Sequence, residues 1–591
     1  MFFLNLKLVI CIFFAISFSA WSDQNSDKIN PEIFNIGSQN KNIKLKKERK
    51  PIVSDNWMVV TANSQASIVA GKILEKGGTA VDAMISAQLV LGLVEPESSG
   101  LGGGAFLVYF DNTKKEVITL DGRETAPLLI KENIFQDVDG KSLKFFDAVV
   151  GGKSVGTPGT PALLEEAYKR WGRTKWSLLF KDAMNLSNNG FIVSKKLNSS
   201  IKRSKNSLSK FINTKTYFLP NNVPLKIGDI HINKKYANTL KVFARDGSKV
   251  FYDGAIGDDI ISTVQKASIN AGFLSHKDLL NYKVIERSPV CSKYRDYEVC
   301  GMGPPSSGAL TISQILGMIE NYNISELGPT NPDTWKIIGD ASRLAFADRS
   351  LYMADSDFIN VPINELIDKN YLYERSKFLD SKNKIEIVKA GKLISKSSSN
   401  WSNDISLELP STSHISIVDI YGNALSMTTT IENGFGSRLM TNGGFLLNNE
   451  LTDFSFKSFK NGKKIANNIE PGKRPRSSMA PTIILKNNRP VYVLGSPGGS
   501  NIIGYVVNAI VSMIDWKNNA QEAASVSHGI NKFGTYYLEK NTFISKLAPS
   551  LEAMNYKVKL KNFSSGLNII NINDRLYGGS DHRREGIAIG N

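Results

Sequence analysis

The chain has 591 residues, of which 41% are hydrophobic and 21% charged, proportions that are ordinary for a globular protein with a sizeable core. Its formal net charge of +17 is spread over many lysine-rich stretches, without an RNA-reading aromatic motif, zinc-finger spacing or a sustained basic stripe. A nucleic-acid partner is therefore not expected. The histidines are scattered, and no H-E-x-x-H motif, acidic loop or Walker loop occurs, so neither a metal nor a cofactor is predicted.

The N-terminus has the pattern of an export signal. Lys7 precedes the apolar run "LVICIFFAISF", which suits a signal peptide but is short for a membrane-spanning helix. The small residues Ala20 and Ser22 favour cleavage after "AWS". We expect a signal peptide over 1–22, a flexible leader over 23–56, and a periplasmic or secreted protein.

Two helices and a glycine-rich turn are predicted next. The segment "ANSQASIVAGKILEKGG" ends in a glycine C-cap, and Thr79 and Asp82 form a capping-box-like start for the second helix. In "GLGGGAFLVYF", Gly100, Gly102 and Ala105 have the spacing of a dinucleotide-binding fingerprint. That fingerprint requires a strand before it and a helix after it, and here the order is reversed. We therefore exclude a dinucleotide site and expect a turn at which backbones approach closely.

Two cysteines follow in "VCSKYRDYEVC". If Arg295 and Asp296 form a two-residue hairpin turn, Cys291 and Cys300 lie opposite each other at a non-hydrogen-bonded pair, where side chains are closest. An oxidising compartment would then allow a disulfide. Two reduced, partly buried thiols are the alternative.

The remaining chain divides into a helical part and a strand-rich part. Ser307 is expected to cap the helix of "SGALTISQILGMIE", and "DTWKIIGDASRLAFADRSLYMAD" predicts a longer one. Residues 381–410 are polar and serine-rich, as in an exposed flexible segment. Beyond Thr412 the pattern is mostly strand, with a helix near 500–515. Without β-α-β alternation, this order indicates sheets covered by helices.

The stretch "STSHISIVDIYGNALSMTTTIENGFG" offers a nucleophile. If the backbone broke between Ser411 and Thr412, Thr412 would carry a free α-amine with a pKa of about 7.7–8.0, able to take the proton from its own hydroxyl. A three-residue loop over 420–422, with Gly422 left-handed, would place Thr430 opposite Thr412. A loop one residue longer or shorter would separate them, and an ordinary threonine-rich hairpin is the alternative.

From about residue 57 to the C-terminus, the chain resembles the γ-glutamyltranspeptidases (glutathione hydrolases), self-cleaving secreted members of the N-terminal nucleophile hydrolases. The resemblance implies an α+β fold, namely a four-layer αββα sandwich. It also implies a large chain, 57–411, and a small chain, 412–591, that stay together as a heterodimer. The strings that carry it occur in one order: "GGTAVDA", "VEPESSGLGGGAF", "DGRETAP", "PPSSGA", "ASRLAFADRSLYMADSDF", "TSHISIVD", "GFLLNNELTDFS", "KRPRSSMAPT", "LGSPGGS" and "YGGSDHR".

The same resemblance implies roles for the reacting groups. Thr412 would attack first its own preceding peptide bond and then the substrate, and Thr430 would tune it. Gly498 and Gly499 would form the oxyanion hole, because glycines let two backbone N–H groups approach a developing oxyanion.

The substrate's head group has implied partners too. Arg123 would bind the α-carboxylate with two parallel hydrogen bonds, helped by the hydroxyls of Ser477 and Ser478. Glu450 and Asp453 would hold the α-ammonium. Read without the resemblance, these acids could be solvated loop residues and Arg123 could serve a surface ion pair.

Three departures from the family pattern concern the substrate. Ser413 replaces a threonine, Glu432 stands where other members carry an asparagine that contacts the substrate amine, and the lysine-rich stretch 457–470 occupies the place of the active-site lid. We expect hydrolysis of γ-glutamyl amides such as glutathione, with water or an amino acid as acceptor. The alternatives are an acylase for a different amide, and a processed but inactive binding protein.

Overall fold

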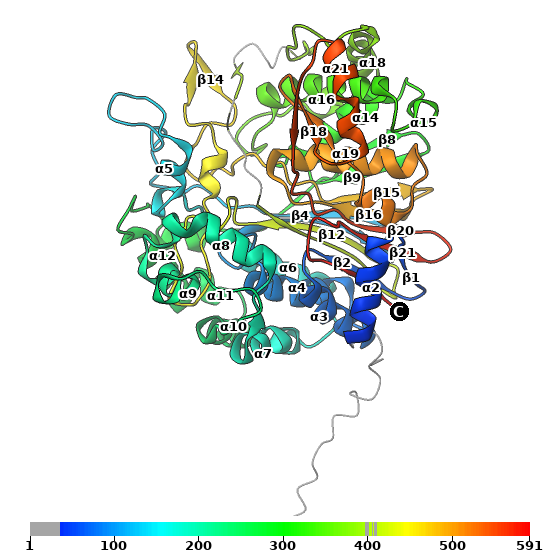
Figure 1. Ribbon diagram of the computed structural model, residues 1–591. Helices are drawn as coiled ribbons and strands as arrows, with labels where there is room; N and C mark the ends of the chain where they lie inside the picture. The colour runs from blue at the N-terminus through cyan, green and yellow to red at the C-terminus, as the bar shows by residue number, and fades with distance from the viewer. Residues whose placement is uncertain (1–35, 396–400, 405, 407–410) are drawn as a thin grey trace, which may run out of the picture.

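Two stacked β-sheets form the centre of the molecule, with helices above and below them (Figure 1). This arrangement confirms the predicted αββα sandwich. The computed structural model describes residues 36–395, 401–404, 406 and 411–591, so the expected signal peptide lies outside the described residues. Within these ranges, no helix combines the length and apolarity needed to cross a membrane.

The first sheet contains the predicted nucleophile hairpin near its middle. All of its neighbouring strands are antiparallel. Its strand order is β22 (Ala588–Gly590), β2 (Met58–Thr61), β11 (Ser413–Val418), β12 (Ala424–Thr430), β3 (Gly104–Asp111), β4 (Glu116–Gly122) and β7 (Ile285–Arg287).

The second sheet is also antiparallel and combines strands from both ends of the chain. Its order is β1 (Ile52–Ser54), β21 (Leu576–Ser580), β20 (Asn568–Ile572), β16 (Arg489–Gly495), β15 (Thr482–Lys486), β9 (Tyr297–Gly301) and β8 (Val290–Tyr294).

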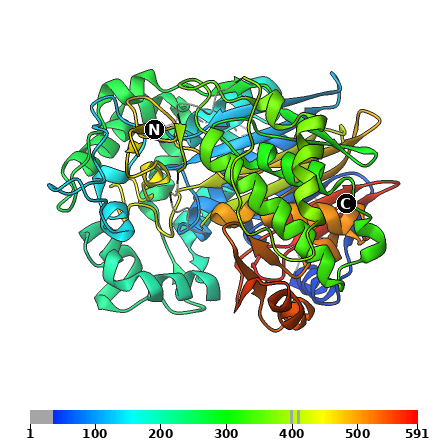
Figure 2. The ribbon, with the colours of Figure 1, turned by 90° about the horizontal axis from the view of Figure 1, so that it is seen from above.

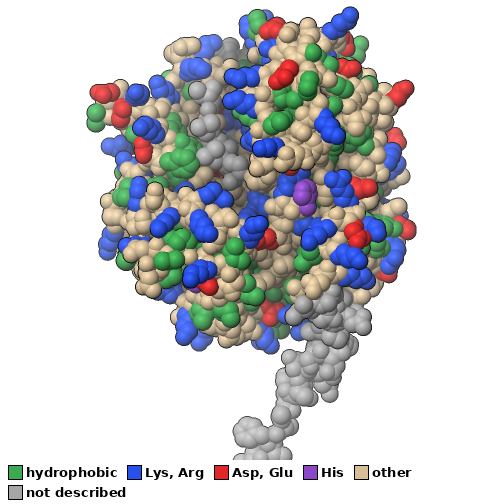
Figure 3. All heavy atoms as spheres, in the orientation of Figure 1, with side chains coloured by type: hydrophobic (Ala, Val, Ile, Leu, Met, Phe, Trp, Pro, Cys, Tyr) green, Lys and Arg blue, Asp and Glu red, His purple; other side chains and the backbone are tan. Residues whose placement is uncertain are grey.

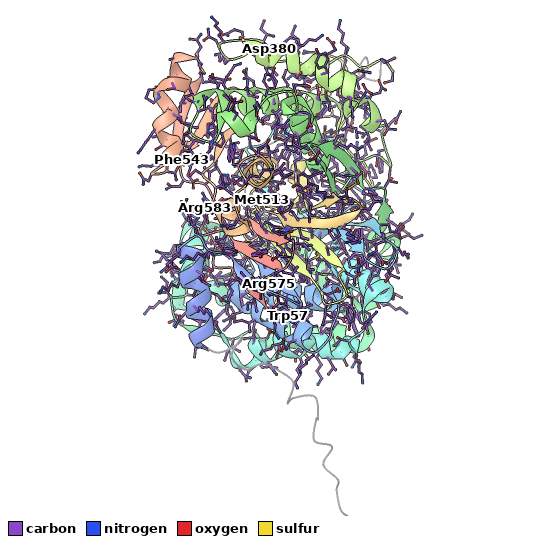
Figure 4. All side chains as sticks on the ribbon, turned by 90° about the vertical axis from the view of Figure 1, so that its right-hand side faces the viewer. Trp57, Asp380, Met513, Phe543, Arg575 and Arg583 are labelled. Carbon is purple, nitrogen blue, oxygen red and sulfur yellow. A yellow bond between two sulfur atoms is a disulfide. The ribbon has the colours of Figure 1, made fainter. Side chains whose placement is uncertain are left out.

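The strands are apolar on both faces because both faces are covered. In β2, Val59 packs toward helices while its neighbour Val60 packs between the sheets, and Leu107 and Phe106 of β3 divide in the same way. Figure 4 labels Met513 and Trp57 on opposite sides of the strands. The flanking helices are α3 (Ser64–Glu75), α4 (Ala80–Val94) and α6 (Thr160–Trp171) on the first sheet, and α14 (Gly308–Ile319), α16 (Pro332–Tyr352) and α19 (Ile502–Ile514) on the second.

Further helices extend the layer that covers the first sheet, and they form one side of the molecule when it is seen from above (Figure 2). They include α7 (Lys181–Asn189), α8 (Lys195–Leu208), α9 (Ile212–Phe218), α10 (Lys234–Asp246) and α12 (Ala255–Gln265).

One predicted helix cap is confirmed and one is wrong. At the start of α4, Thr79 and Asp82 form a reciprocal capping box. Ser307 occupies the N-cap position of α14, but its side chain makes no cap bond. Its hydroxyl instead donates to the carbonyl of Ser477 at 2.7 Å and accepts from Nε of Arg349 at 2.8 Å. A tertiary contact has replaced the local one.

Part of the segment expected to be a leader is helical. Residues Ile36–Lys47 form α2, and Lys46 Nζ donates to the carbonyls of Arg584 and Gly586 at 2.8 and 2.7 Å. Burial lowers the pKa of Lys46 to about 8. These carbonyl acceptors are far away in sequence, which is why a local pattern did not predict an ordered helix.

The predicted cysteine hairpin is present. Tyr294 pairs with Tyr297 across a two-residue turn, and Cys291 pairs with Cys300 at a Cα–Cα distance of 4.1 Å and is joined to it by a disulfide.

Replacing both cysteines by alanine should lower the free energy of unfolding by about 2–4 kcal/mol, because the bond no longer restricts the unfolded chain. The measurement is the melting temperature of wild type and variant, with and without reductant. Reductant should lower the melting temperature of the wild type and leave the variant unchanged. A wild type that is insensitive to reductant would contradict the bond.

Candidate active site

The nucleophile hairpin has the predicted register. Ser413 pairs with Thr429 and Val418 with Ala424, which sets Thr412 opposite Thr430. Gly422 is left-handed with φ of 77°, and its N–H donates to the carbonyl of Asp419. The hydroxyl oxygens of Thr412 and Thr430 are 3.4 Å apart. The contact between the two hydroxyls is therefore confirmed.

The peptide bond that precedes Thr412 is held among hydroxyl groups. The carbonyl oxygen of Ser411 accepts from the hydroxyl of Thr412, and from that of Thr430 at 3.0 Å. The Ser411 hydroxyl donates to the carbonyl of Glu97 at 2.6 Å. This carbonyl is thus polarised by donors while the Thr412 oxygen lies beside it, the arrangement that an N–O acyl shift needs.

The glycine-rich turn before β3 lets other backbones approach the nucleophile strand. A Cβ on Gly103 would lie 2.0 Å from the carbonyl oxygen of Thr430, and one on Gly102 would lie 2.1 Å from that of Leu446. The predicted close approach is confirmed. It occurs directly beside Thr430, so these glycines help to build the site rather than a nucleotide loop.

Arg123 lies at the end of β4 in a buried cluster of acids. Its Nη1 donates to Glu450, and its Nη2 donates to Oδ2 of Asp453 at 2.6 Å. Both acids belong to the short 3-10 helix η7 (Glu450–Asp453), which brings them to one side. The solvated-loop interpretation of these residues is therefore wrong, since Arg123 and Glu450 are each 1% exposed.

The cluster contains more acids than cations. Glu124 lies 4.0 Å from Arg123 Nη1, and burial raises its pKa to about 7 although the arginine opposes this. Burial also raises the pKa of Glu450 well above its usual range. The buried carboxyl groups can therefore compensate the charge of an added cation as well as that of Arg123.

Glu432 joins this acidic side. Its φ of 70° is left-handed, and Asn449 Nδ2 donates to its carboxylate. Its backbone N–H donates to Oγ1 of Thr430 at 2.9 Å. This backbone bond orients Thr430 whichever side chain residue 432 carries. A glutamate in place of asparagine at this position therefore changes the pocket but leaves the contact between Thr412 and Thr430 intact.

Ser477 and Ser478 line the same site, and sequence reasoning missed a partner of theirs. Arg349, on α16, donates from Nη2 to the Ser478 hydroxyl at 2.8 Å, and its Nε bonds Ser307. Arg349 is a charged residue on a helix that has buried residues on every side, and this pattern could have identified it. Its exposed fraction is 3%. Arg349 positions the serine loop.

His414 is a second missed residue. It is fully buried, which lowers its pKa to about 3, so it is neutral, and its ring nitrogens bond the hydroxyls of Thr428 at 2.8 Å and Ser416 at 3.1 Å. A Cβ on Gly495 would lie 2.2 Å from this ring. His414 therefore sets the distance between the nucleophile strand and the end of β16, which leads into the glycine pair.

Gly498 and Gly499 both have left-handed backbones, with φ of 146° and 57°. Gly499 lines the same small cavity as the nucleophile, whereas Gly498 does not contribute to its wall. A Cβ on Gly498 would lie 2.5 Å from the ring of Tyr505, so the position requires glycine.

One cavity collects most of the predicted site residues. Its volume is about 20 Å³, roughly the room for one water molecule, so the uncleaved chain leaves no room for a glutamyl group. Its wall is formed by Arg123, Ser411, Thr412, Thr430, Glu432, Glu450, Asp453, Ser477, Ser478, Met479, Gly499 and Ile502. The combination of a hydroxyl nucleophile, one buried guanidinium and several acids matches an α-amino acid head group.

The lysine-rich stretch 457–470 lies beside this site. It contains a hairpin of β13 (Phe459–Lys460) and β14 (Lys463–Ile465). Strand β14 also pairs with β10 (Trp401–Ser402), just ahead of the expected cleavage site.

Comparison with known proteins adds four similarities. The profile described as gamma-glutamyltranspeptidase matches residues 66–591. The chain is 33% identical to the glutathione hydrolase proenzyme of Bacillus subtilis (strain 168), across 91% of this chain and 92% of the relative. It is 32% identical to the acylase ACY 1 proenzyme of Pseudomonas sp. (strain V22), across 89% and 91%. The cephalosporin acylase structure from Bacillus halodurans superposes with a TM-score of 0.79 at 23% identity, covering 92% and 97%, which supports the fold.

Replacing Glu124 by glutamine should change how stability depends on pH. The folded protein keeps a proton on Glu124 up to about pH 7, whereas the unfolded chain releases it near the ordinary value of 4.5. The wild type therefore loses stability relative to Glu124→Gln as pH rises from about 5 to about 8.

The measurement is the melting temperature of both proteins across that range, with Glu132→Gln as an exposed control. The gap between wild type and Glu124→Gln should widen toward high pH, while the control stays parallel to the wild type. A constant gap would mean that Glu124 is already ionised in the folded protein.

Proposed function

The chain belongs to the gamma-glutamyltranspeptidase family, and we propose that Thr412 is the nucleophile of both its maturation and its catalysis. The protein is a self-processing enzyme that cleaves γ-glutamyl amides. The observation that carries the residue assignment is the single cavity wall that holds Thr412, Thr430, Arg123 and the η7 acids together.

Maturation begins at the Ser411 carbonyl. The Thr412 Oγ1 forms a bond to the carbonyl carbon, the C–N bond breaks as the hydroxyl proton passes to the departing nitrogen, and an ester replaces the amide. Water then hydrolyses the ester, which leaves a carboxylate on Ser411 and a free α-amine on Thr412. The products are a large chain that ends at Ser411 and a small chain, 412–591, that remain packed as a heterodimer because each sheet takes strands from both.

In turnover the Thr412 Oγ1 attacks the γ-carbonyl carbon of the substrate, and the new α-amine of Thr412 takes the hydroxyl proton. The tetrahedral oxyanion accepts hydrogen bonds from the N–H groups of Gly498 and Gly499. The C–N bond breaks and the proton passes to the leaving amine. Water or an amino acid then attacks the ester, releases the glutamyl group and restores the hydroxyl. Glutathione is the substrate that the relative's name supports.

Substrate binding uses the buried charges. Arg123 binds the α-carboxylate together with the hydroxyls of Ser477 and Ser478, and the acids at 450 and 453 bind the α-ammonium. Glu432 adds a third carboxylate on the ammonium side. Each protein charge then keeps an opposite partner when the substrate enters.

The enzyme is exported in this proposal, to the periplasm or outside the cell. The apolar run that follows Lys7 and the Cys291–Cys300 disulfide support this location, because disulfides persist in oxidising compartments.

An acylase for another amide is the second candidate. The similarity to acylase ACY 1 and the carboxylate of Glu432 in the pocket favour it. A correctly cut enzyme that ignores γ-glutamyl-p-nitroanilide would support this candidate, and Glu432→Asn would then be the first variant to test for restored turnover.

Replacing Thr412 by alanine should abolish self-cleavage, because no other side chain takes the place of its oxygen. Intact-mass analysis should detect two chains from the wild type and one from Thr412→Ala. Thr429→Ala is the matched control, since it removes the hydroxyl of a neighbouring buried threonine and should be cut normally. A wild type that stays as one chain would disprove self-processing.

Replacing Arg123 by lysine should lower kcat/KM for γ-glutamyl-p-nitroanilide by about 10–100-fold, mainly through KM, because the forked hydrogen bonds are lost while the charge is kept. Two chains in the intact mass of Arg123→Lys would verify its fold. Unchanged kinetics in a correctly cut variant would remove Arg123 from substrate binding.

A further inference from the structure

A basic groove borders the scissile bond on the side away from the acidic cavity. Its volume is about 610 Å³, far larger than the cavity at Thr412. Helix α8 is labelled in Figure 1, and Figure 3 shows Lys and Arg side chains on that same face of the molecule. Figure 4 labels Arg583, another residue of the groove wall, at the edge of the molecule. The charged wall residues of the groove are Glu97, Asp147, Lys196, Arg203, Lys210, Arg438, Arg583 and Arg584.

One face of α8 forms a wall of the groove along its whole length. Lys196, Ser200, Arg203 and Ser207 recur at helical spacing, and Lys210 follows just beyond the end of the helix. At a rise of about 1.5 Å per residue, the wall from the first lysine to the last extends roughly 20 Å. The groove is therefore suited to an elongated ligand.

Some of the groove's cations already have acidic partners. Lys196 pairs with Glu95 and Glu97, each at 2.9 Å, and Arg583 pairs with Glu539 and Asp581.

Four others have none among the described residues, and of these Arg438 is buried and donates to Asn433 Oδ1 at 2.7 Å. Arg203 donates to the Ser200 hydroxyl at 2.9 Å and Arg584 to the Ser564 carbonyl at 3.1 Å, both neutral acceptors, and Lys210 has no ion pair within the ranges described. Arg203 and Lys210 are exposed. The groove thus has positive charge that its own acids leave uncompensated.

The groove and the acidic cavity meet at Ser411, which contributes to the walls of both. Neighbouring residues 432 and 433 likewise face the cavity and the groove, respectively. The groove is therefore a large space that adjoins the cavity at the carbonyl next to Thr412.

We propose that the basic groove binds the leaving part of the donor, and the acceptor that replaces it, and that it selects peptides with several carboxylates. This inference rests on the proposed function. The groove is longer than a single amino acid or a dipeptide requires, and the charges of Arg203, Lys210 and Arg584 favour more than one anionic group on the ligand. The preferred substrates are γ-glutamyl peptides whose remaining residues are acidic.

The test compares two donors of equal size that differ in the charge of the leaving dipeptide. One is γ-glutamyl-glutamyl-glutamate, and the other is γ-glutamyl-glutaminyl-glutamine amide, whose leaving part has no carboxylate. Wild-type kcat/KM should be about tenfold higher for the acidic donor, and salt should reduce this preference. Arg203→Gln/Lys210→Gln should lower the preference about five- to tenfold.

The matched control is Lys202→Gln/Lys205→Gln, which removes the same charge from exposed positions of α8 that do not contribute to the groove. It should keep the wild-type preference. An equal effect of both double variants, or no preference in the wild type, would overturn the inference. Turnover of γ-glutamyl-p-nitroanilide by the wild type tests the proposed function separately, since its failure there would be independent of the groove.

Discussion

The pairing of β11 with β12 is the constraint on which the site depends. Side chains alternate along a strand, so a shift of one residue would turn Thr430 away from Thr412 and bury the wrong faces of both strands. The tight loop at Asp419–Gly422 excludes that shift, and the buried His414 and the close glycine turn hold the pair from two further directions. Register, packing and chemistry are therefore specified by the same few contacts.

The charge cluster around Arg123 is constrained by the need to pair buried charges. A lone guanidinium or a lone carboxylate in this buried place would be strongly unfavourable. The folded precursor avoids this by pairing Arg123 with Glu450 and Asp453, and an amino acid that enters brings one charge of each sign. The resting ion pairs thus occupy the positions that the substrate's two charges take in the proposed complex, which keeps the pocket folded before any ligand arrives.

What the sequence predicted well is local. The cysteine hairpin, the Thr79 capping box and the loop at Gly422 depend on residues a few positions apart. The family resemblance supplied the layers and the candidate residues, most of which line one cavity. Contacts between distant segments could not be predicted. The Arg349–Ser478 bond, the Gly495–His414 contact and the ordered α2 each join segments whose proximity only the assembled sheets create.

Nearly the whole chain separates β2 from its edge partner β22, and β2 lies directly beside the strand that follows Thr412. The sheet that contains β11 therefore stays incomplete until β22 has been synthesised. In the proposed maturation, the cut before Thr412 depends on the finished sheet and so follows the folding of the segments on both sides of that bond. The strand order therefore delays the proposed cut until the two resulting chains are already packed against each other.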